Sequence, residues 1–188
     1  MVLDIVMNGK KLIIFDLDET LIHATKEKLN IPEDFRYQAF YIYKRPGLDQ
    51  FLEACSELYP IALWSSADDE YVEAIARLLQ SEKQYFEFVW ARSACWMKVI
   101  RTEDPETGLK RKKHQFIKPL EKIRIKGWQM RNLLIIDDSL YKVTDNPQNY
   151  IVIKAFEGDA KDGELGRLLK YLKQAINYED FRDLVYKQ

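Results

Sequence analysis

The sequence predicts an α/β fold in which a parallel sheet is flanked by helices. Two observations favour it: strand-like apolar runs alternate with amphipathic helical segments, and several of these runs end directly in polar or charged side chains. Polar groups at strand ends are typical of the edge at which such sheets bind ligands. The length of 188 residues suits one domain, so we expect a single domain over residues 1–188, with a small insertion at about 92–116.

The first strand is predicted at residues 12–15, an apolar run that leads directly into Asp-Leu-Asp-Glu-Thr at 16–20. This spacing places Asp16 and Asp18 at the carboxyl end of a buried strand. Two carboxylates so close together repel each other, and therefore need a cation, a proton or both. The pair indicates a metal-assisted active site.

Three later segments repeat this arrangement, each with polar side chains directly after an apolar run. The runs cover 59–64, 116–117 and 132–136, and the residues that follow them are Ser65 and Ser66, Lys118, and Asp137 and Asp138. Because the carboxyl ends of parallel strands share one edge of a sheet, we expect these side chains to meet there.

Helices are predicted where apolar residues recur at intervals of three and four. Three stripes show this spacing, at 48–55, 72–79 and 165–176, and a short final helix is expected from about residue 178, with Phe181, Leu184 and Val185 facing inward. Further strands are expected at 86–90 and 150–153.

Two segments interrupt the alternation of strands and helices. Residues 26–43 are expected to form a flap with one or two short strands, since the stretch at 40–44 is aromatic and β-prone. The insertion centres on a turn signal at 103–108, which residues 99–102 and the strand-like residues near Phe116 could flank as a hairpin.

The composition excludes several classes of protein. Hydrophobic residues make up 47% and charged residues 31%, as in a soluble globular protein, and a net charge of -1 provides no field that would recruit nucleic acid or anionic lipid. No apolar stretch approaches the ~20 residues of a membrane span, and residues 1–11 lack a signal-peptide pattern. We therefore expect a soluble intracellular protein, with the cytoplasm favoured over the nucleus, no direct nucleic-acid or membrane partner, and a monomer favoured.

Taken in order, the four motifs resemble those of the haloacid-dehalogenase superfamily of phosphotransferases. The stretches at 16–23, 44–47, 63–66 and 92–95 are similar to one branch of it, the RNA polymerase II C-terminal-domain phosphatases and their NLI-interacting-factor-like relatives. The similarity extends from about residue 12 to about residue 172. It implies a Rossmann-like haloacid-dehalogenase fold and a Mg²⁺-dependent phosphatase that hydrolyses phosphate monoesters.

The resemblance gives the two acids of the first motif different roles. A carboxylate is a competent nucleophile toward phosphorus, so Asp16 is expected to form an aspartyl-phosphate intermediate. Asp18 is expected to protonate the leaving oxygen and later to deprotonate the hydrolytic water, which requires a raised pKa. Thr20 is expected to hold the orientation of this loop and is counted with the substrate-binding residues.

The phosphoryl group is expected to bind at the second and third motifs. Ser65 and Ser66 precede a helix, and their hydroxyls together with the first free N–H groups of that helix suit an anion. Lys118, held extended before a proline, would neutralise both the nucleophile and the phosphoryl oxygens. Ser65 stands where relatives often have threonine, a change that keeps the hydroxyl.

Mg²⁺ is the expected cofactor, because two anions must approach each other and Mg²⁺ prefers hard oxygen ligands. Asp16 and Asp137 are the expected carboxylate ligands, and Asp138 could bind directly or through water. The main-chain carbonyl of Asp18 is a ligand that the resemblance implies. Asp138 departs from the asparagine that the eukaryotic small phosphatases tend to have, and it adds negative charge near the metal.

Taken singly, the motifs have plainer interpretations. The first could begin a calcium loop, although Leu21 stands where such a loop requires glycine. The serine pair and Asp137-Asp138 could be simple helix caps, and Lys118 a surface lysine. The basic run at 110–114 could be a solvated face or a dock for an acidic or phosphorylated partner.

Three functions follow from these motifs. The resemblance favours phosphoserine or phosphothreonine in a phosphoprotein or phosphopeptide, because a small insertion leaves the site open to a protein loop. A small-molecule phosphatase of the same superfamily is the second, although such enzymes usually have a larger cap. The third is a non-catalytic binding module, such as a receptor subunit of the mitochondrial import machinery, against which the complete set of motif residues argues.

Overall fold

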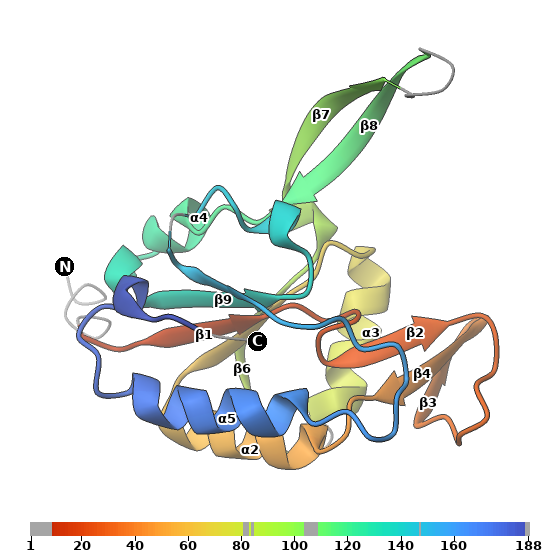
Figure 1. Ribbon diagram of the computed structural model, residues 1–188, viewed down its shortest axis with the longest axis horizontal. Helices are drawn as coiled ribbons and strands as arrows, with labels where there is room; N and C mark the ends of the chain where they lie inside the picture. Colours follow the sequence, from red (N-terminus) through yellow and green to blue (C-terminus); the bar gives the residue numbers. More distant parts are fainter. Residues whose placement is uncertain (1–8, 81–82, 84, 104–108, 147, 187–188) are drawn as a thin grey trace.

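A five-stranded parallel sheet forms the centre of the computed structural model, which describes residues 9–80, 83, 85–103, 109–146 and 148–186 (Figure 1). The strand order is β10-β9-β1-β5-β6, with β1 in the middle. The strands are β1 (Leu12–Phe15), β5 (Ile61–Trp64), β6 (Phe86–Trp90), β9 (Leu133–Asp137) and β10 (Tyr150–Val152). The α/β class and the main strand positions expected from the sequence are confirmed.

Both faces of β1 are covered, which explains why its sequence is apolar throughout instead of alternating. Ile13 and Phe15 belong to one buried cluster, whereas Leu12 and Ile14 belong to a second cluster on the opposite face, and all four are 0% exposed. The strand is therefore fixed from two sides, and so is the position of Asp16 directly after it.

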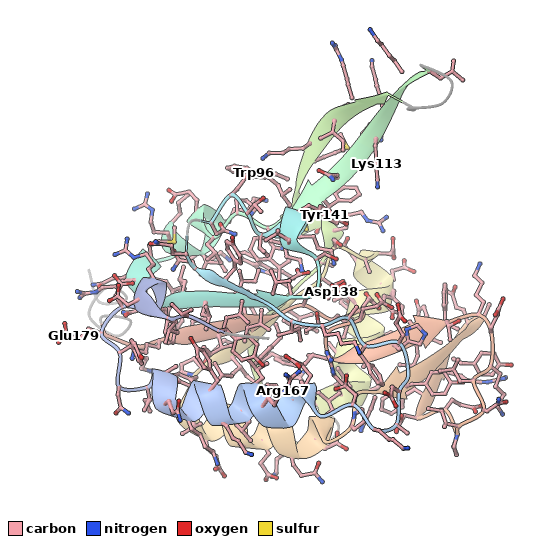
Figure 2. The ribbon with its side chains drawn as sticks, viewed as in Figure 1. Trp96, Lys113, Asp138, Tyr141, Arg167 and Glu179 are labelled. Carbon is pink, nitrogen blue, oxygen red and sulfur yellow. The ribbon has the colours of Figure 1, made fainter. Side chains whose placement is uncertain are left out.

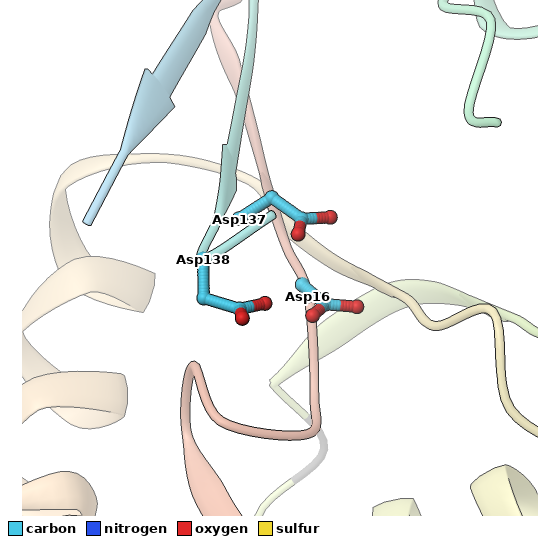
Figure 3. Close-up of side chains that lie close together, drawn as sticks. All are labelled: Asp16, Asp137 and Asp138. Atoms are coloured by element: carbon cyan, nitrogen blue, oxygen red, sulfur yellow. The ribbon is translucent and has the colours of Figure 1, made fainter. Parts of the chain in front are cut away.

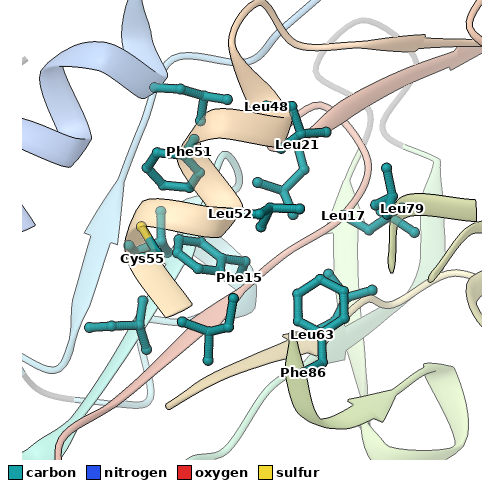
Figure 4. Packing of buried hydrophobic residues seen from close by; sticks show 14 of the residues in the cluster. Phe15, Leu17, Leu21, Leu48, Phe51, Leu52, Cys55, Leu63, Leu79 and Phe86 are labelled. Atoms are coloured by element: carbon teal, nitrogen blue, oxygen red, sulfur yellow. The ribbon is translucent and has the colours of Figure 1, made fainter. Parts of the chain in front are cut away.

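Three amphipathic helices cover one face of the sheet, as their periodicity predicted. They are α2 (Leu48–Leu58), α3 (Asp69–Gln80) and α5 (Glu164–Ala175), and their buried apolar residues all enter the first cluster. Figure 4 shows Phe51, Leu52 and Cys55 of α2 against Phe15 of β1, with the rings of Phe15 and Phe51 5.3 Å apart. The other face is covered by the short helix α4 (Glu121–Arg124) and neighbouring loops.

The flap is a three-stranded antiparallel sheet of order β2-β4-β3. Its strands are β2 (Ile22–Thr25), β3 (Phe35–Tyr37) and β4 (Phe40–Lys44). One or two strands were expected within 26–43, and β2 lies before that range. The sequence of β2 gives little sign of a strand, because its pairing with β4 and not an apolar alternation defines it.

The insertion forms a two-stranded antiparallel hairpin of β7 (Trp96–Glu103) and β8 (Lys110–Ile117), as expected. It projects from the body of the molecule, with Trp96 near its base and Lys113 further along it (Figure 2). The turn signal predicted at 103–108 lies mostly outside the described residues. Residues 116–117, which resembled a sheet strand, belong to this hairpin, and β8 returns to the body just before Lys118.

The final helix expected from residue 178 is a single 3-10 turn, η4 (Phe181–Asp183). Phe181 is buried and Leu184 is half-buried, but Val185 is 73% exposed, so its inward placement was wrong. Among the helices that the structure describes, none combines the length and the apolar character that crossing a membrane would require.

Candidate active site

Three carboxylates gather at the carboxyl edge of the central sheet. β1 and β9 are parallel neighbours, Phe15 is paired with Ile136, and the N–H of Asp16 donates to the carbonyl of Ile136 at 2.9 Å. This register brings Asp16 beside Asp137 and Asp138, and one oxygen from each lies within 4.8 Å of the others (Figure 3). The clustering predicted from the two motifs is present.

Lys118 is fully buried between two of these carboxylates. Its ammonium group donates to Asp16 and, at 2.6 Å, to Asp137. Asn146 holds its main chain: the Asn146 side chain donates to the carbonyl of Lys118 and accepts from the N–H of Leu120, both at 2.8 Å. The motif lysine thus joins the carboxylate cluster, although it follows the hairpin and not a strand of the central sheet.

A second buried lysine, which the sequence did not single out, completes the cluster. Lys142 lies in the turn η3 (Leu140–Lys142), and its Nζ is 3.2 Å from Asp16 Oδ2, 3.4 Å from Asp137 Oδ1 and 3.6 Å from Asp138 Oδ1. Lys118 contacts the other oxygens of Asp16 and Asp137. The only sequence signal is the position of Lys142 four residues after Asp138, and this does not distinguish it from a surface lysine.

The two lysines set the charge of Asp16. Burial alone would raise the pKa of Asp16, but Lys118 and Lys142 hold it below its usual value. For Asp137, burial and the neighbouring charge of Asp16 outweigh the same two lysines and raise the pKa to about 6. Of these two carboxylates, Asp16 is therefore held more firmly in the ionised form than Asp137.

The cluster fits a hard divalent cation. Its donors are carboxylate oxygens, which Mg²⁺ prefers. In addition, Oδ1 of Asp138 is buried and accepts no hydrogen bond from any described residue, and Nζ of Lys142 lies 3.6 Å from it. A buried carboxylate oxygen without a hydrogen bond is costly unless a cation compensates it. Asp16, Asp137 and Asp138 could thus hold Mg²⁺ with their side chains.

The carboxylate of Asp18 is not part of this cluster. Its oxygens accept hydrogen bonds from the Tyr71 hydroxyl at 2.6 Å and from the Ser65 hydroxyl at 3.3 Å. Burial raises the pKa of Asp18, and this effect prevails over the hydrogen bond from Tyr71. The sequence did not single out Tyr71, because it lies outside the apolar stripe that identified α3.

Thr20 links the two carboxylate loops. Its side chain is buried, its hydroxyl accepts from the N–H of Asp138 at 3.1 Å, and it donates a long hydrogen bond of 3.5 Å to Asp16. Glu19, just before it, has a φ of 59°, a left-handed conformation that is uncommon outside glycine. Thr20 thus lies where it can hold the loop, as expected, and its place among the substrate-binding residues stays a prediction.

The serine motif is already partly hydrogen-bonded within the protein. Ser65 Oγ accepts from the N–H of Ala67 at 3.0 Å, and the Asp68 carboxylate accepts from the N–H of Glu70 at 3.1 Å, at the start of α3. The carbonyl of Ser66 accepts from Arg92 at 3.0 Å. Two of the N–H groups expected to receive a phosphate therefore have acceptors, and the Ser65 hydroxyl points toward Asp18.

A cleft of about 380 Å³ opens beside Asp18. Its apolar walls come from Ala24, Tyr37 and Phe40 of the flap, from Ala67 just before α3 and from Tyr71 of α3. Tyr37 packs edge-on against Tyr71, with ring centroids 5.4 Å apart. Asp18 lines this cleft, whereas the carboxylate cluster of Asp16, Asp137 and Asp138 is not part of its lining.

Arg45 supports the loop that follows β1 and carries Asp16, Asp18 and Thr20. It is 0% exposed, and its guanidinium donates to both oxygens of Asp162 at 2.8 Å, to the carbonyl of Lys154 at 2.9 Å and to the carbonyl of Thr20 at 3.1 Å. This arginine from the 44–47 stretch is therefore structural, and it ties the loop after β1 to the segment that precedes α5.

Comparison with known proteins finds a matching family, related sequences and a similar fold. The sequence model of the NLI interacting factor-like phosphatase family matches residues 11–182. The chain is 26% identical to Phosphatase PSR1 of Saccharomyces cerevisiae (88% of this chain, 36% of the relative), and 25% identical to a probable C-terminal domain small phosphatase of Dictyostelium discoideum (93% and 53%). It therefore spans about half or less of the length of these two relatives.

A solved structure has the same fold. The fission yeast RNA polymerase II CTD phosphatase Fcp1-R271A, bound to beryllium fluoride, superposes with a TM-score of 0.54 at 20% sequence identity. The match covers 97% of this chain and 55% of that one. At this identity the likeness concerns the fold alone, and it agrees with the haloacid-dehalogenase architecture that the motifs implied.

Proposed function

The chain belongs to the NLI interacting factor-like phosphatase family, and we propose that it hydrolyses phosphoserine or phosphothreonine in proteins through an aspartyl-phosphate on Asp16. The observation that supports this most is the contrast between two acids only two residues apart. The pKa of Asp16 is lowered between two lysines, whereas that of Asp18 is raised at the end of a cleft. Divergent environments of this kind separate a nucleophile from a general acid.

In the first step, an ionised oxygen of Asp16 attacks phosphorus, and the bond from phosphorus to the ester oxygen breaks. The proton of Asp18 goes to that leaving oxygen, which departs as the serine or threonine hydroxyl. Ser65 and Tyr71, which bond to Asp18, act as positioning residues for this transfer. Lys118 keeps Asp16 ionised and oriented.

In the second step, the Asp18 carboxylate takes a proton from water while the water oxygen bonds to phosphorus. The bond between phosphorus and the Asp16 oxygen breaks, which releases inorganic phosphate and restores both acids. Such transfer depends mainly on placement and on charge neutralisation. Mg²⁺, held by Asp16, Asp137 and Asp138 with the carbonyl of Asp18 as a further implied ligand, supplies positive charge beside the transferring group when it is bound.

Two features support a protein substrate. The cleft beside Asp18 is open to the surface between the flap and α3, and no larger cap covers it among the described elements. The relatives also include proteins named as C-terminal domain phosphatases, which by name act on polypeptides. A phosphorylated loop could therefore enter with its flanking side chains along the aromatic wall of the cleft.

The direct test compares the wild type with Asp16→Asn on an aryl phosphate, with and without MgCl₂. We expect Mg²⁺-dependent turnover that falls by about 10³-fold or more in the variant. Asp183→Asn, an exposed acid on η4, is the matched control and should retain full activity. Activity that survived in Asp16→Asn would overturn the nucleophile assignment.

A second assay addresses the substrate class. Phosphopeptides and a panel of phosphorylated metabolites are compared by kcat/KM under the same conditions. Higher values on phosphopeptides are expected, and a clear preference for one metabolite would replace the protein substrate with a small molecule. The absence of turnover on every ester, despite Mg²⁺ binding, would point to a binding module.

A further inference from the structure

One face of the β7–β8 hairpin is a continuous row of side chains, all of them exposed except the half-buried Phe116. Residues paired across an antiparallel ladder point to the same side, and alternate pairs share a face. Three alternate pairs make up this row, which we name the hairpin stripe: Met97 with Phe116, Val99 with His114, and Arg101 with Lys112. The stripe is apolar near the body of the protein and basic further out.

The inner end of the hairpin stripe lies beside the candidate active site. The guanidinium of Arg92 lies over the ring of Phe116, 5.2 Å from its centroid, and Nε of Arg92 donates to the carbonyl of Ser66. Ser66 follows Ser65, whose hydroxyl donates to Asp18. A polypeptide that presents its phosphoresidue to Asp16 could therefore continue from the Ser65–Ser66 loop over Phe116 and onto the stripe.

The outer end of the hairpin stripe concentrates positive charge. The two strands contain six Lys or Arg residues and one Glu, in a chain whose net charge is -1. Arg101 and Lys112 are both exposed and are paired directly across the ladder, where like charges destabilise a sheet. Within the described part of the chain, no carboxylate forms an ion pair with either. An anionic ligand would relieve this repulsion.

The exposed apolar residues of the stripe favour a polypeptide over a nucleic acid. Met97 is 58% and Val99 51% exposed, and they lie between the basic pair and the active site. Single-stranded nucleic acids bind through aromatic stacking platforms along a basic groove. The aromatic side chains of the stripe are Phe116 and His114, and the guanidinium of Arg92 already lies over the half-buried ring of Phe116. The aliphatic side chains of a polypeptide can pack on Met97 and Val99.

We propose that the hairpin stripe docks an Asp- and Glu-rich segment of the protein substrate. This inference rests on the proposed function and specifies the substrate. Met97 and Arg101 are four residues apart, about 13 Å along the strand, so the acidic segment begins at a distance from the phosphoresidue. When the path over Phe116 is included, the acidic segment lies about four to eight residues from the phosphoresidue in an extended substrate.

The test uses synthetic phosphopeptides with one phosphoserine and a block of four Asp or Glu residues. The block is placed next to the phosphoserine, or about six residues from it on either side, and Asn and Gln replace it in the control peptide. For the wild type we expect kcat/KM on the best distant acidic peptide to exceed that on the neutral peptide about tenfold, with a preference that falls as salt rises. The adjacent block should give little gain.

Variants locate the effect on the hairpin. The double variant Arg101→Ala/Lys112→Ala should lose the acidic preference while keeping full activity on an aryl phosphate. Lys113→Ala is the matched control, because Lys113 pairs with Ile100 on the opposite face of the same hairpin. It should keep the preference. Equal kcat/KM for acidic and neutral peptides in the wild type, or equal loss in both variants, would overturn the proposal.

Binding separates this proposal from the proposed function. Fluorescence anisotropy with the unphosphorylated acidic peptide measures docking even if no turnover is found on any ester. Binding that the double variant weakens about tenfold supports the hairpin stripe irrespective of catalysis. Tighter binding of a single-stranded RNA of equal charge, or of vesicles containing phosphatidylserine, with the same dependence on Arg101 and Lys112, would contradict an acidic peptide as the ligand.

Discussion

The charged groups at the sheet edge and those of the hairpin differ in burial and in ion pairing. Lys118 and Lys142 are buried among three carboxylates, and each contacts more than one of them. Arg101 and Lys112 are exposed, directly paired like charges. Removal of one member of a buried network leaves a charge without compensation, whereas an exposed charge is solvated in any case. The difference indicates that the first set holds the fold and the chemistry together, and that the second is available to a partner.

The largest expected effect comes from removing the buried ammonium. We expect Lys118→Met to lower the free energy of unfolding by about 3–5 kcal/mol, because Asp16 and Asp137 lose the nearer of the two cations that both contact. Lys112→Met on the hairpin is the paired control and should change it by less than about 0.5 kcal/mol. Urea denaturation of the two variants makes the comparison, and equal small effects would remove the contrast.

Arg45 is a buried cation outside the carboxylate cluster, and its removal should also destabilise the fold. Arg45→Met should lower the free energy of unfolding by about 3 kcal/mol, since it removes the guanidinium that donates to both oxygens of Asp162 and to the carbonyl of Thr20. We also expect lower kcat on an aryl phosphate, because Thr20 belongs to the loop that carries Asp16 and Asp18. Thermal denaturation combined with kinetics measures both effects. A variant that was destabilised but kept its kcat would show that Arg45 supports only the fold.

The same ion pair gives a pH dependence. Burial would raise the pKa of Asp162, but the hydrogen bonds from Arg45 hold it below its usual value of 3.8. A lowered pKa in the folded state adds stability above the unfolded pKa, and this stability is lost as the pH falls through the folded value. The stability difference between wild type and Asp162→Asn should therefore be constant near neutral pH and shrink below about pH 4. Urea denaturation over this range would contradict the ion pair if the difference grew instead.

A smaller effect is expected at Lys142, where a cation lies among all three carboxylates. In Lys142→Met, the protein without added metal should be less stable than the wild type by about 1–2 kcal/mol. Added MgCl₂ should then raise the melting temperature more in the variant than in the wild type, because the carboxylates lack a competing ammonium. Equal shifts in scanning calorimetry would show that Lys142 and the metal do not share these ligands.

The sequence was most informative where one local rule determined the structure. The apolar run at 12–15 predicted a strand covered on both faces, and β1 is 0% exposed throughout. The intervals of three and four predicted α2, α3 and α5 with their buried faces. The motif order brought Asp16, Asp137 and Asp138 together, because parallel neighbours end at the same edge.

The features that sequence reasoning missed depend on tertiary contacts. Lys142 and Tyr71 are polar residues in a turn and on the edge of a helical stripe, and only the packing of η3 and α3 brings them to Asp16 and Asp18. β2 forms because its main chain pairs with that of β4 in an antiparallel sheet. Among the described residues after α5, Phe181 is the only buried side chain, so a single turn suffices and Val185 is exposed to solvent.

The most direct test is whether the phosphoryl group of a substrate passes through Asp16. A ³²P-labelled phosphopeptide is mixed with the protein and MgCl₂, the reaction is stopped in acid during turnover, and the protein is digested and mapped by mass spectrometry. The label should appear on the peptide that contains Asp16, and it should be absent from Asp16→Asn. Turnover without any labelled aspartate, or label on another residue, would contradict the assignment of Asp16 as nucleophile.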